Sequence, residues 1–355
     1  MKNKSAYGQK IAVGYPGKPV YPGMGNQCDY GRGVRNGGGQ RPPGRYAMNF
    51  FRTDMAVESA QAVGRSVRGL QVEERTEGEG IKVTVVDVTD AYGEKMVNKP
   101  MGRYVTIDVP DMALGDIPTN KEAARIFAQE LEKLLQVGGE DAPYLVVGVG
   151  NRSVTADSVG PLAAEGIIVT RHMFGELREF LPPKARSACA IAPGVLGETG
   201  LETGEVIKSL VEEIKPRAVI AIDSLAAQKP QRIAASIQVA NTGISPGSGL
   251  GNNRPRLDKA YLGVPVIAVG VPMVVYASSI AYEASSSALE DADVPERVKE
   301  RLVEMLNTSC GDLVVTPKDV DAIADNCAAI LSSGINMAIH DLSYDEAAEY
   351  QLSLS

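Results

Sequence analysis

The stretch Tyr144–Pro161 reads YLVVGVGNRSVTADSVGP, an apolar run that passes into a turn rich in glycine and small polar residues. Its first part, Tyr144–Val149, is rich in valine, which is typical of a buried strand. The helical stripe before this strand consists of Phe127, Leu131, Leu134 and Leu135. A helix, a buried strand and a glycine turn in succession indicate the repeating unit of an α/β fold.

The same alternation continues toward the C-terminus. Thr203 is placed to cap an amphipathic helix, and the apolar strand Ala218–Ile222 follows it. A further strand is expected at Val264–Val269, and a last helix is expected to open with Thr316 as its cap and Pro317 at its first position. Apolar strands that alternate with amphipathic helices predict an α/β fold with a mainly parallel sheet flanked by helices on both faces.

The N-terminal part of the chain has a different composition. Residues 1–46 are dense in glycine and proline and offer few large apolar side chains, which predicts a flexible leader. Two β-branched runs follow, Lys82–Val88 and Tyr104–Val109, with a turn-rich stretch between them. They predict an antiparallel pair, either at the edge of the sheet or in a small β-rich subdomain at about residues 80–115.

Length and charge exclude several classes of protein. The chain has 355 residues, 44% of them hydrophobic, which is enough for one large core. Its formal net charge of -8 opposes a general nucleic-acid-binding role, because phosphate contacts need a basic surface. The sequence lacks a run of about 18 apolar residues that would span a membrane, and Met1–Gln9 is too polar for a secretory signal. We therefore expect a cytoplasmic protein without membrane attachment.

The cysteines and histidines form no recognisable metal or disulfide pattern. Four scattered cysteines without a C-x-x-C pair predict reduced thiols: Cys28, Cys189, Cys310 and Cys327. The chain has two histidines, His172 and His340, and no H-E-x-x-H motif, so a histidine-rich zinc hydrolase is hard to build. We expect a structural role for both histidines.

Two aspartates follow the predicted strands where an α/β active site is expected. Asp157 lies in the turn after the first strand, and Asp223 ends the second in the run Ala221–Ala227. Sites in open α/β sheets lie beyond the carboxyl ends of the strands, so both carboxylates can face one crevice. Two close carboxylates do not easily both ionise; one then keeps its proton as an acid while the other activates water. This chemistry suits peptide hydrolysis without a covalent intermediate.

Other functions are open at this point. The aspartates can instead be structural, with Asp157 capping a helix and Asp223 ending a strand beside a turn, as in a non-catalytic assembly protein. A dinucleotide-dependent oxidoreductase would use Gly148 and Gly150, but the third required glycine position is Ser153. The small-residue loop Ile244–Arg254 can offer backbone N–H groups to a substrate or an anion, or be a plain connection.

Taken together, these segments resemble the spore germination protease family, endopeptidases that break down small acid-soluble spore proteins. The resemblance covers most of the chain from about Phe51 to His340. The segments that carry it are Arg52–Glu58, Gly148–Pro161, Thr170–His172, Ala192–Val195, Ala221–Ala227, Ile244–Asn252, Gly263–Pro272 and Val315–Lys318. The family's two proposed catalytic aspartates fall on Asp157 and Asp223.

The resemblance also implies a fold, a processing step and partners. The family's fold is similar to that of the peptidases that trim hydrogenase precursors, where an acidic pair and a histidine bind a metal. The sequence leaves a metal open here, implies no other cofactor, and makes His172 the histidine to test. The family is made as a self-processing zymogen, which implies a cut between Asp54 and Met55, a leader at residues 1–54 and a peptidase domain at 55–355. Implied partners are small acid-soluble spore proteins in the spore core and three further copies in a homotetramer, with no direct nucleic-acid binding.

Overall fold

The structure is a computed structural model, and it describes most of the chain from residue 53 onward. The described residues are 53–64, 67–78, 80–135, 142–245, 256–289, 295–310 and 313–354. The chain divides into two units, residues 1–44 and 45–355, and all the described residues belong to the second. The predicted flexible leader at residues 1–46 and Cys28 lie outside the described residues.

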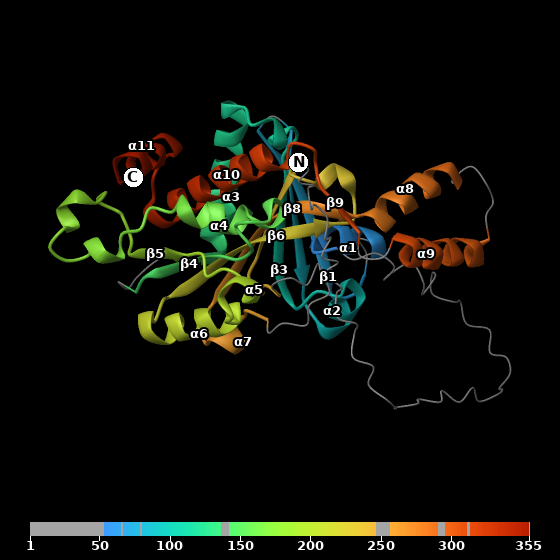
Figure 1. Cartoon of the computed structure of the whole chain (residues 1–355), viewed down its shortest axis with the longest axis horizontal. Coiled ribbons are helices and arrows are strands. Elements are labelled where there is room, and N and C mark those ends of the chain that lie inside the picture. Colours follow the sequence, from blue (N-terminus) through green and yellow to red (C-terminus); the bar gives the residue numbers. More distant parts are fainter. Residues whose placement is uncertain are drawn as a thin grey trace, which may run out of the picture. The chain divides into compact units, whose positions relative to one another are not determined.

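The described residues form one sheet of nine strands (Figure 1). In chain order the strands are β1 (Leu70–Glu77), β2 (Ile81–Val88), β3 (Gly102–Asp108), β4 (Tyr144–Gly148), β5 (Ala188–Ile191), β6 (Ala218–Ala227), β7 (Ser236–Ala240), β8 (Val266–Tyr276) and β9 (Val314–Val315). Their order across the sheet is β1-β2-β3-β7-β8-β6-β4-β5, and β9 pairs with β8. The predicted pair at 82–88 and 104–109 is thus found as β2 and β3, which lie next to the edge strand β1 of this sheet.

The sheet has a parallel and an antiparallel part. Strands β5, β4, β6 and β8 run parallel, whereas β1, β2, β3 and β7 follow in antiparallel pairs and join β8 through β7. The link from β6 to β7, residues 228–235, contains a 3-10 turn in place of an α-helix. Parallel neighbours need a crossover of about a dozen residues or more. The short link therefore reverses the chain, and the antiparallel part is larger than the sequence pattern suggested.

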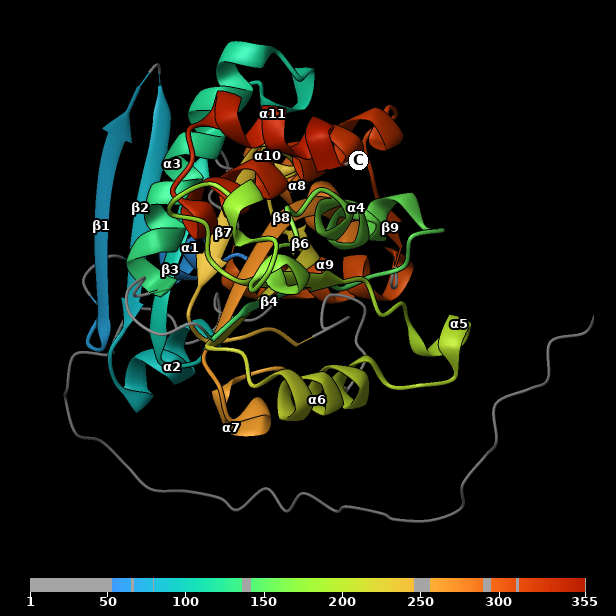
Figure 2. The same cartoon turned by 90° about the vertical axis from the view of Figure 1, so that its left-hand side faces the viewer.

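Helices cover both faces of the sheet, as predicted. The α-helices are α1 (Ala56–Val63), α2 (Ala91–Val97), α3 (Ile117–Leu135), α4 (Val159–Glu165), α5 (Leu196–Thr199), α6 (Thr203–Ile214), α7 (Lys259–Leu262), α8 (Ala277–Leu289), α9 (Glu296–Cys310), α10 (Val320–His340) and α11 (Tyr344–Leu354). Figure 2 shows α3 and α10 on one side of the strands and α6 on the other. Tyr144 and Val146 of β4 join the core beneath α3, α4 and α10. Leu145 and Val147 join the core beneath α1 and α6. The α/β fold with two covered faces is confirmed.

Helix α10 is long and apolar enough to cross a membrane by length and composition. However, 72% of its apolar window is buried inside the protein. Cys327, Leu331 and Ile335 of this helix are fully buried in the core that also contains α3. The apolar character of α10 is therefore explained by its place in the core.

Two predicted helix starts are wrong by a few residues. Thr203 is the first residue of α6 and not its cap; the N-cap is Glu202, and the Thr203 hydroxyl donates to the Gly194 carbonyl. Helix α10 begins at Val320 and not at Pro317, because residues 316–319 first lead the chain away from β9. At α6, the predicted capping residue Thr203 instead uses its hydroxyl for a tertiary contact with Gly194.

Candidate active site

The sheet has a topological switch point between β4 and β6, where successive connections place the next strands on opposite sides of β4. The candidate residues lie near this point. The chain goes from β4 through α4 to β5 on one side, then through α6 to β6 on the other side of β4. Helices α4 and α6 belong to the cores on opposite faces. A crevice outside the carboxyl ends of the strands is expected at such a switch point.

Asp223 lies just past the end of β4. The last residue of β4, Gly148, pairs with Ile222, whereas β6 continues to Ala227. Asp223 therefore does not end its strand, as the sequence had suggested, because β6 and β8 stay paired beyond it. Its side chain is buried with 7% exposure, and Oδ1 accepts a hydrogen bond from the Ser224 N–H at 2.9 Å.

Asp157 lies in the turn after β4, at the end of the 3-10 helix η2 (Thr155–Asp157). Its Oδ2 accepts a hydrogen bond from the Asn151 N–H at 2.9 Å. The N-cap of α4 is Ser158, which makes no side-chain cap bond, so Asp157 does not cap this helix. The Asp157 side chain instead links the end of the glycine turn back to its start at Asn151.

This closed turn explains its glycines. Gly150 has a φ of +124°, and a Cβ there would lie 2.1 Å from the Asp157 carbonyl oxygen. At Gly160, at the start of α4, a Cβ would lie 2.2 Å from the Val149 carbonyl oxygen and 2.5 Å from that of Ile222. The glycines are thus needed for close backbone packing around Asp157, which accounts for them without a bound dinucleotide.

One cavity brings together three of the four predicted site residues. It has a volume of about 640 Å³, and Asp54, Asp157 and Asp223 all line it. The fourth residue, Met55, is fully buried beside Val57 and Ala227. Ser245, at the start of the predicted small-residue loop, also lines the cavity, and residues 246–255 lie outside the described part.

The segment around the predicted processing bond is bound to the end of β6. The Asp54 N–H donates to the Ala226 carbonyl at 2.8 Å, and the Ala226 N–H donates to the Asp54 carboxylate at 2.8 Å. Lys99 Nζ donates to the Thr53 carbonyl at 2.8 Å. Gln238 of β7 donates to the Asp54 carbonyl at 3.0 Å and accepts from the Ala56 N–H at 2.7 Å.

Glu58 fixes the start of α1 to the same region. Its side chain is buried and accepts from the N–H groups of Gln228 and Lys229 at 2.7 and 2.9 Å. It also accepts from the Thr53 hydroxyl and lies 3.5 Å from the guanidinium of Arg232. A buried carboxylate with this many donors is well compensated, so it holds Thr53 and α1 in place.

The sequence analysis missed Lys99, Gln238 and Glu58. The signal for Gln238 was a polar residue in the middle of the apolar run Ser236–Ala240. Glu58 occurs in the segment that carried the family resemblance, but nothing local indicated its partners. No comparable signal existed for Lys99.

Burial lowers the pKa of Lys99 below its usual range, and the nearby charge of Asp54 opposes this by raising it. Arg256, which also lines the cavity, lowers the pKa of Lys99 further, while Glu58 raises it. The ammonium group thus depends on the acidic residues of the segment 53–58 for its compensation.

The histidines do not join the aspartates. His172 is exposed on the 3-10 helix η3 (Arg171–Met173) and does not line the cavity. His340 is fully buried at the end of α10, where Nε2 donates to the Ile168 carbonyl at 3.0 Å and Nδ1 accepts from the Arg186 N–H at 3.4 Å. Burial lowers its pKa to about 4, so it is neutral. The structural role expected for His340 is confirmed.

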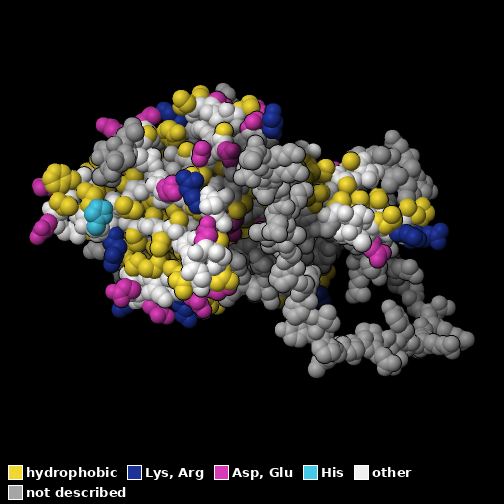
Figure 3. Space-filling model, viewed as in Figure 1, with side chains coloured by type: hydrophobic (Ala, Val, Ile, Leu, Met, Phe, Trp, Pro, Cys, Tyr) yellow, Lys and Arg dark blue, Asp and Glu magenta, His cyan; other side chains and the backbone are white. Residues whose placement is uncertain are grey.

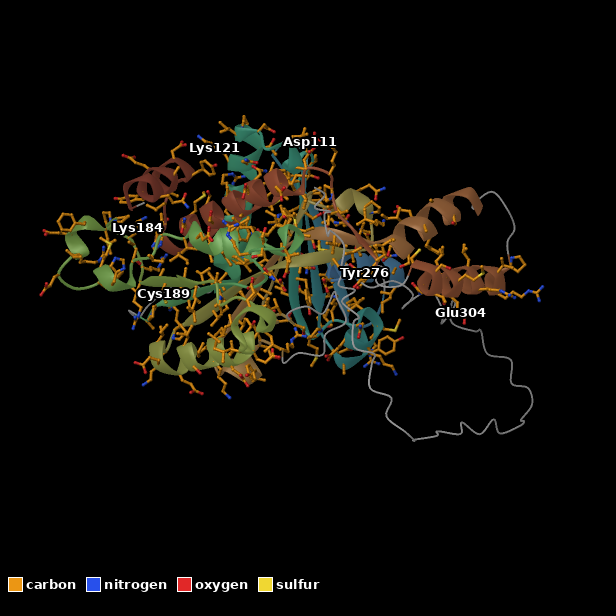
Figure 4. The ribbon with its side chains drawn as sticks, viewed as in Figure 1. Asp111, Lys121, Lys184, Cys189, Tyr276 and Glu304 are labelled. Atoms are coloured by element: carbon orange, nitrogen blue, oxygen red, sulfur yellow. The ribbon has the colours of Figure 1, made fainter. Side chains whose placement is uncertain are left out.

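The sequence leaves a metal open, and in the described part of the chain no group of three His, Cys, Asp or Glu side chains that could hold a metal ion occurs. Cys189, on β5 (Figure 4), Cys310 and Cys327 are free thiols. Figure 3 shows acidic and basic side chains interspersed over the described surface of one face.

Comparison with known proteins gives one consistent family. A family model described as germination protease matches residues 51–292. A germination protease of Clostridium perfringens (strain SM101) is 43% identical over 312 residues, which covers 82% of this chain and 96% of the relative. The germination protease of Bacillus velezensis is 36% identical over 357 residues and covers 85% and 96%.

Among solved structures, a [NiFe] hydrogenase maturation protease from Thermococcus kodakarensis matches with 16% identity and a TM-score of 0.25. The match covers 52% of this chain and 98% of that chain.

Proposed function

The chain belongs to the germination protease family and is a protease, and we propose that it is a self-processing endopeptidase in which Asp157 and Asp223 activate the attacking water. Its substrates in this proposal are small acid-soluble spore proteins, which it begins to degrade in the spore core during germination. The active form is a homotetramer of chains that have lost residues 1–54.

One observation carries the proposal. Asp54, the residue before the proposed cut, lines the same cavity as Asp157 and Asp223. The three residues are far apart in the sequence, and the first comes from outside the sheet. A bond that the enzyme cuts in its own chain must reach the catalytic groups, so this shared cavity supports both the aspartate pair and the processing site.

The chemistry follows from two carboxyl groups in one cavity. In the proposed mechanism one of them keeps its proton, since two negative charges close together repel. The ionised carboxylate takes a proton from water, and the oxygen of this water attacks the peptide carbonyl carbon. The protonated carboxyl then gives its proton to the leaving nitrogen as the C–N bond breaks. If self-cleavage needs the protonated carboxyl, mild acid favours processing.

Intact mass spectrometry of the purified full chain tests the proposal. Incubation at mild acid is expected to remove residues 1–54 from the wild type, after which the product cleaves an acid-soluble spore protein. Asp157→Asn and Asp223→Asn are expected to abolish both steps while the thermal midpoint stays close to that of the wild type. Asp345→Asn, at an exposed aspartate on α11, is the matched control and is expected to process normally.

Two outcomes would contradict the proposal in different ways. Near-normal processing of either variant would remove that aspartate from the mechanism. An N-terminus that keeps its mass in the wild type across pH 5 to 8 would remove the zymogen step and favour a non-catalytic reading of the aspartates.

A further inference from the structure

A single side chain, that of Gln238, spans the peptide bond between Asp54 and Met55. Its Nε2 donates to the Asp54 carbonyl oxygen at 3.0 Å, and its Oε1 accepts from the Ala56 N–H at 2.7 Å. A carbonyl can only accept and an N–H can only donate, so just one orientation of the amide satisfies both bonds. The amide therefore holds the carbonyl oxygen of this bond and the next N–H along the chain at once.

Gln238 lies in the same row of the sheet as Asp223. Gln238 pairs with Gly270 from β7, and Asp223 pairs with Gly270 from β6. Residues paired across neighbouring strands point to the same face of a sheet. Both side chains are buried, at 8% and 7% exposure, and both line the 640 Å³ cavity. The Gln238 amide, which contacts the Asp54 carbonyl, thus lies on the same face of the sheet as Asp223, where the proposed water activation occurs.

The bonds on either side of Gln238 leave the peptide little freedom. Lys99 holds the Thr53 carbonyl, and Ala226 exchanges two bonds with Asp54. The Met55 N–H donates to the Thr53 hydroxyl at 3.0 Å. The Met55 side chain is fully buried among Val57 and Ala227. The Asp54 carbonyl is therefore presented to Gln238 in one orientation.

We propose that Gln238 binds the carbonyl oxygen of the bond that is cut and stabilises the negative charge that this oxygen acquires when water attacks. The inference rests on the proposed function, because it takes the cut to fall between Asp54 and Met55. In this step the water oxygen bonds to the Asp54 carbonyl carbon while a carboxylate takes the water proton. The negatively charged oxygen keeps its hydrogen bond from Gln238 Nε2 until the C–N bond breaks. The Met55 nitrogen then receives a proton from the other carboxyl. A donor preorganised for a developing oxyanion typically contributes about 10²–10³-fold in rate.

Gln238→Glu tests this role because it changes one bond only. The glutamate has the same length and still accepts from the Ala56 N–H, but its ionised carboxylate cannot donate to the Asp54 carbonyl. We expect leader removal to slow by about 10²–10³-fold at pH 7, as for other lost oxyanion donors. Below the pKa of the new carboxyl, its proton restores a donor, so the deficit relative to wild type should shrink as the pH falls.

Two further variants separate catalysis from structure. Gln238→Met has a similar length and no donor at any pH, so its deficit should stay constant across the same pH range. Gln129→Glu, on the exposed side of α3, makes the same chemical change away from the cavity and should process like the wild type. Thermal midpoints of all three variants report on folding. If Gln238→Glu does not fold, the rate of leader removal in Gln238→Met decides whether Gln238 has the proposed role.

The outcomes distinguish this inference from the proposed function. Gln238→Glu and Gln238→Met that process within about threefold of wild type, far below the loss expected for an oxyanion donor, overturn the role of Gln238. The aspartate chemistry stands in that case if Asp223→Asn fails to process. A slow Gln238→Glu without recovery in acid also overturns the role, because a structural defect would not depend on the proton. Slow processing of the Gln238 variants together with normal processing of the aspartate variants would support the proposed role of Gln238 and contradict the proposed role of the aspartate pair. A wild type that never loses its leader overturns both.

Discussion

Asp223 and Gln238 pair with the same residue, Gly270, one from each side, so that a carboxylate and an amide share one face of the sheet across a position without a side chain. Leu225 packs over this glycine, since its Cγ would lie 2.6 Å from a Cβ built there. The row joins the two halves of the sheet, because Asp223 belongs to the parallel part and Gln238 to the antiparallel part. The candidate site therefore depends on both.

Gly270→Ala is expected to lower activity more than stability. The added Cβ would lie 2.6 Å from Leu225 Cγ and 2.9 Å from the Asp223 carbonyl oxygen, so Leu225 or the backbone of Asp223 must move. Overpacking of this kind costs about 1–3 kcal/mol of the free energy of unfolding. A shift of the Asp223 backbone misplaces its carboxylate, and if Asp223 acts as proposed, leader removal should slow by more than about tenfold, as expected when a catalytic group moves by about an ångström. Urea unfolding and intact mass measure the two effects.

The control for this substitution is Gly197→Ala in α5, where a new Cβ meets nothing within 4 Å. It should leave both the unfolding midpoint and the processing rate close to wild type. Equal behaviour of the two alanine variants would show that Gly270 has room for a side chain and that the row is less tightly packed than described.

Lys99 is expected to titrate below the usual range of lysine, and Asp54→Asn is expected to lower its pKa further. Burial is the main cause of the low pKa, and the negative charge of Asp54 raises it, so removing this charge removes part of the compensation. More of the amine is then neutral at a given pH and reacts faster with an acetylating reagent. Mass spectrometry of Lys99 acetylation against pH gives the titration midpoint. Asp345→Asn should leave this midpoint in place, and an unmoved midpoint in Asp54→Asn would argue against the electrostatic effect of Asp54 on Lys99.

His340 makes the fold sensitive to acid. Burial lowers its pKa from 6.5 to about 4, and a proton on Nδ1 would face the Arg186 N–H, donor against donor. Because the folded pKa is the lower one, the stabilisation is complete above pH 6.5 and is lost as the pH falls toward 4. The difference corresponds to about 3 kcal/mol in the free energy of unfolding.

His340→Gln isolates this contribution. Glutamine can donate to the Ile168 carbonyl and accept from the Arg186 N–H without taking up a proton, so the variant should lose less stability than the wild type between pH 7 and pH 4.5. Urea unfolding at both pH values gives the comparison, and the difference between the two proteins cancels the carboxyl groups they share. Parallel losses in both proteins would mean that His340 does not carry this pH dependence.

Part of the candidate site could be predicted, because its two aspartates lie at or just after apolar runs that read as strands. Asp157 and Asp223 were expected to share a crevice from their places after two apolar runs, and both line one cavity with Asp54. Gln238 could not be assigned in the same way. It is a polar residue on a buried strand, and its partner, the segment 53–56, lies about 180 residues away in the chain.

The sequence by itself determined the strands β2, β3, β4, β6 and β8, the helices α3, α6 and α10, the two covered faces and the place of the two aspartates near the ends of strands, because apolar periodicity is a local property that each segment carries with it. Only the tertiary structure decided that β7 turns back antiparallel against β8 and places Gln238 opposite Asp223 across Gly270. It also decided that Asp54 binds at Ala226. Strand neighbours and docked segments are chosen by contacts between residues far apart in the chain, and the free energy of such contacts is not written in any one segment.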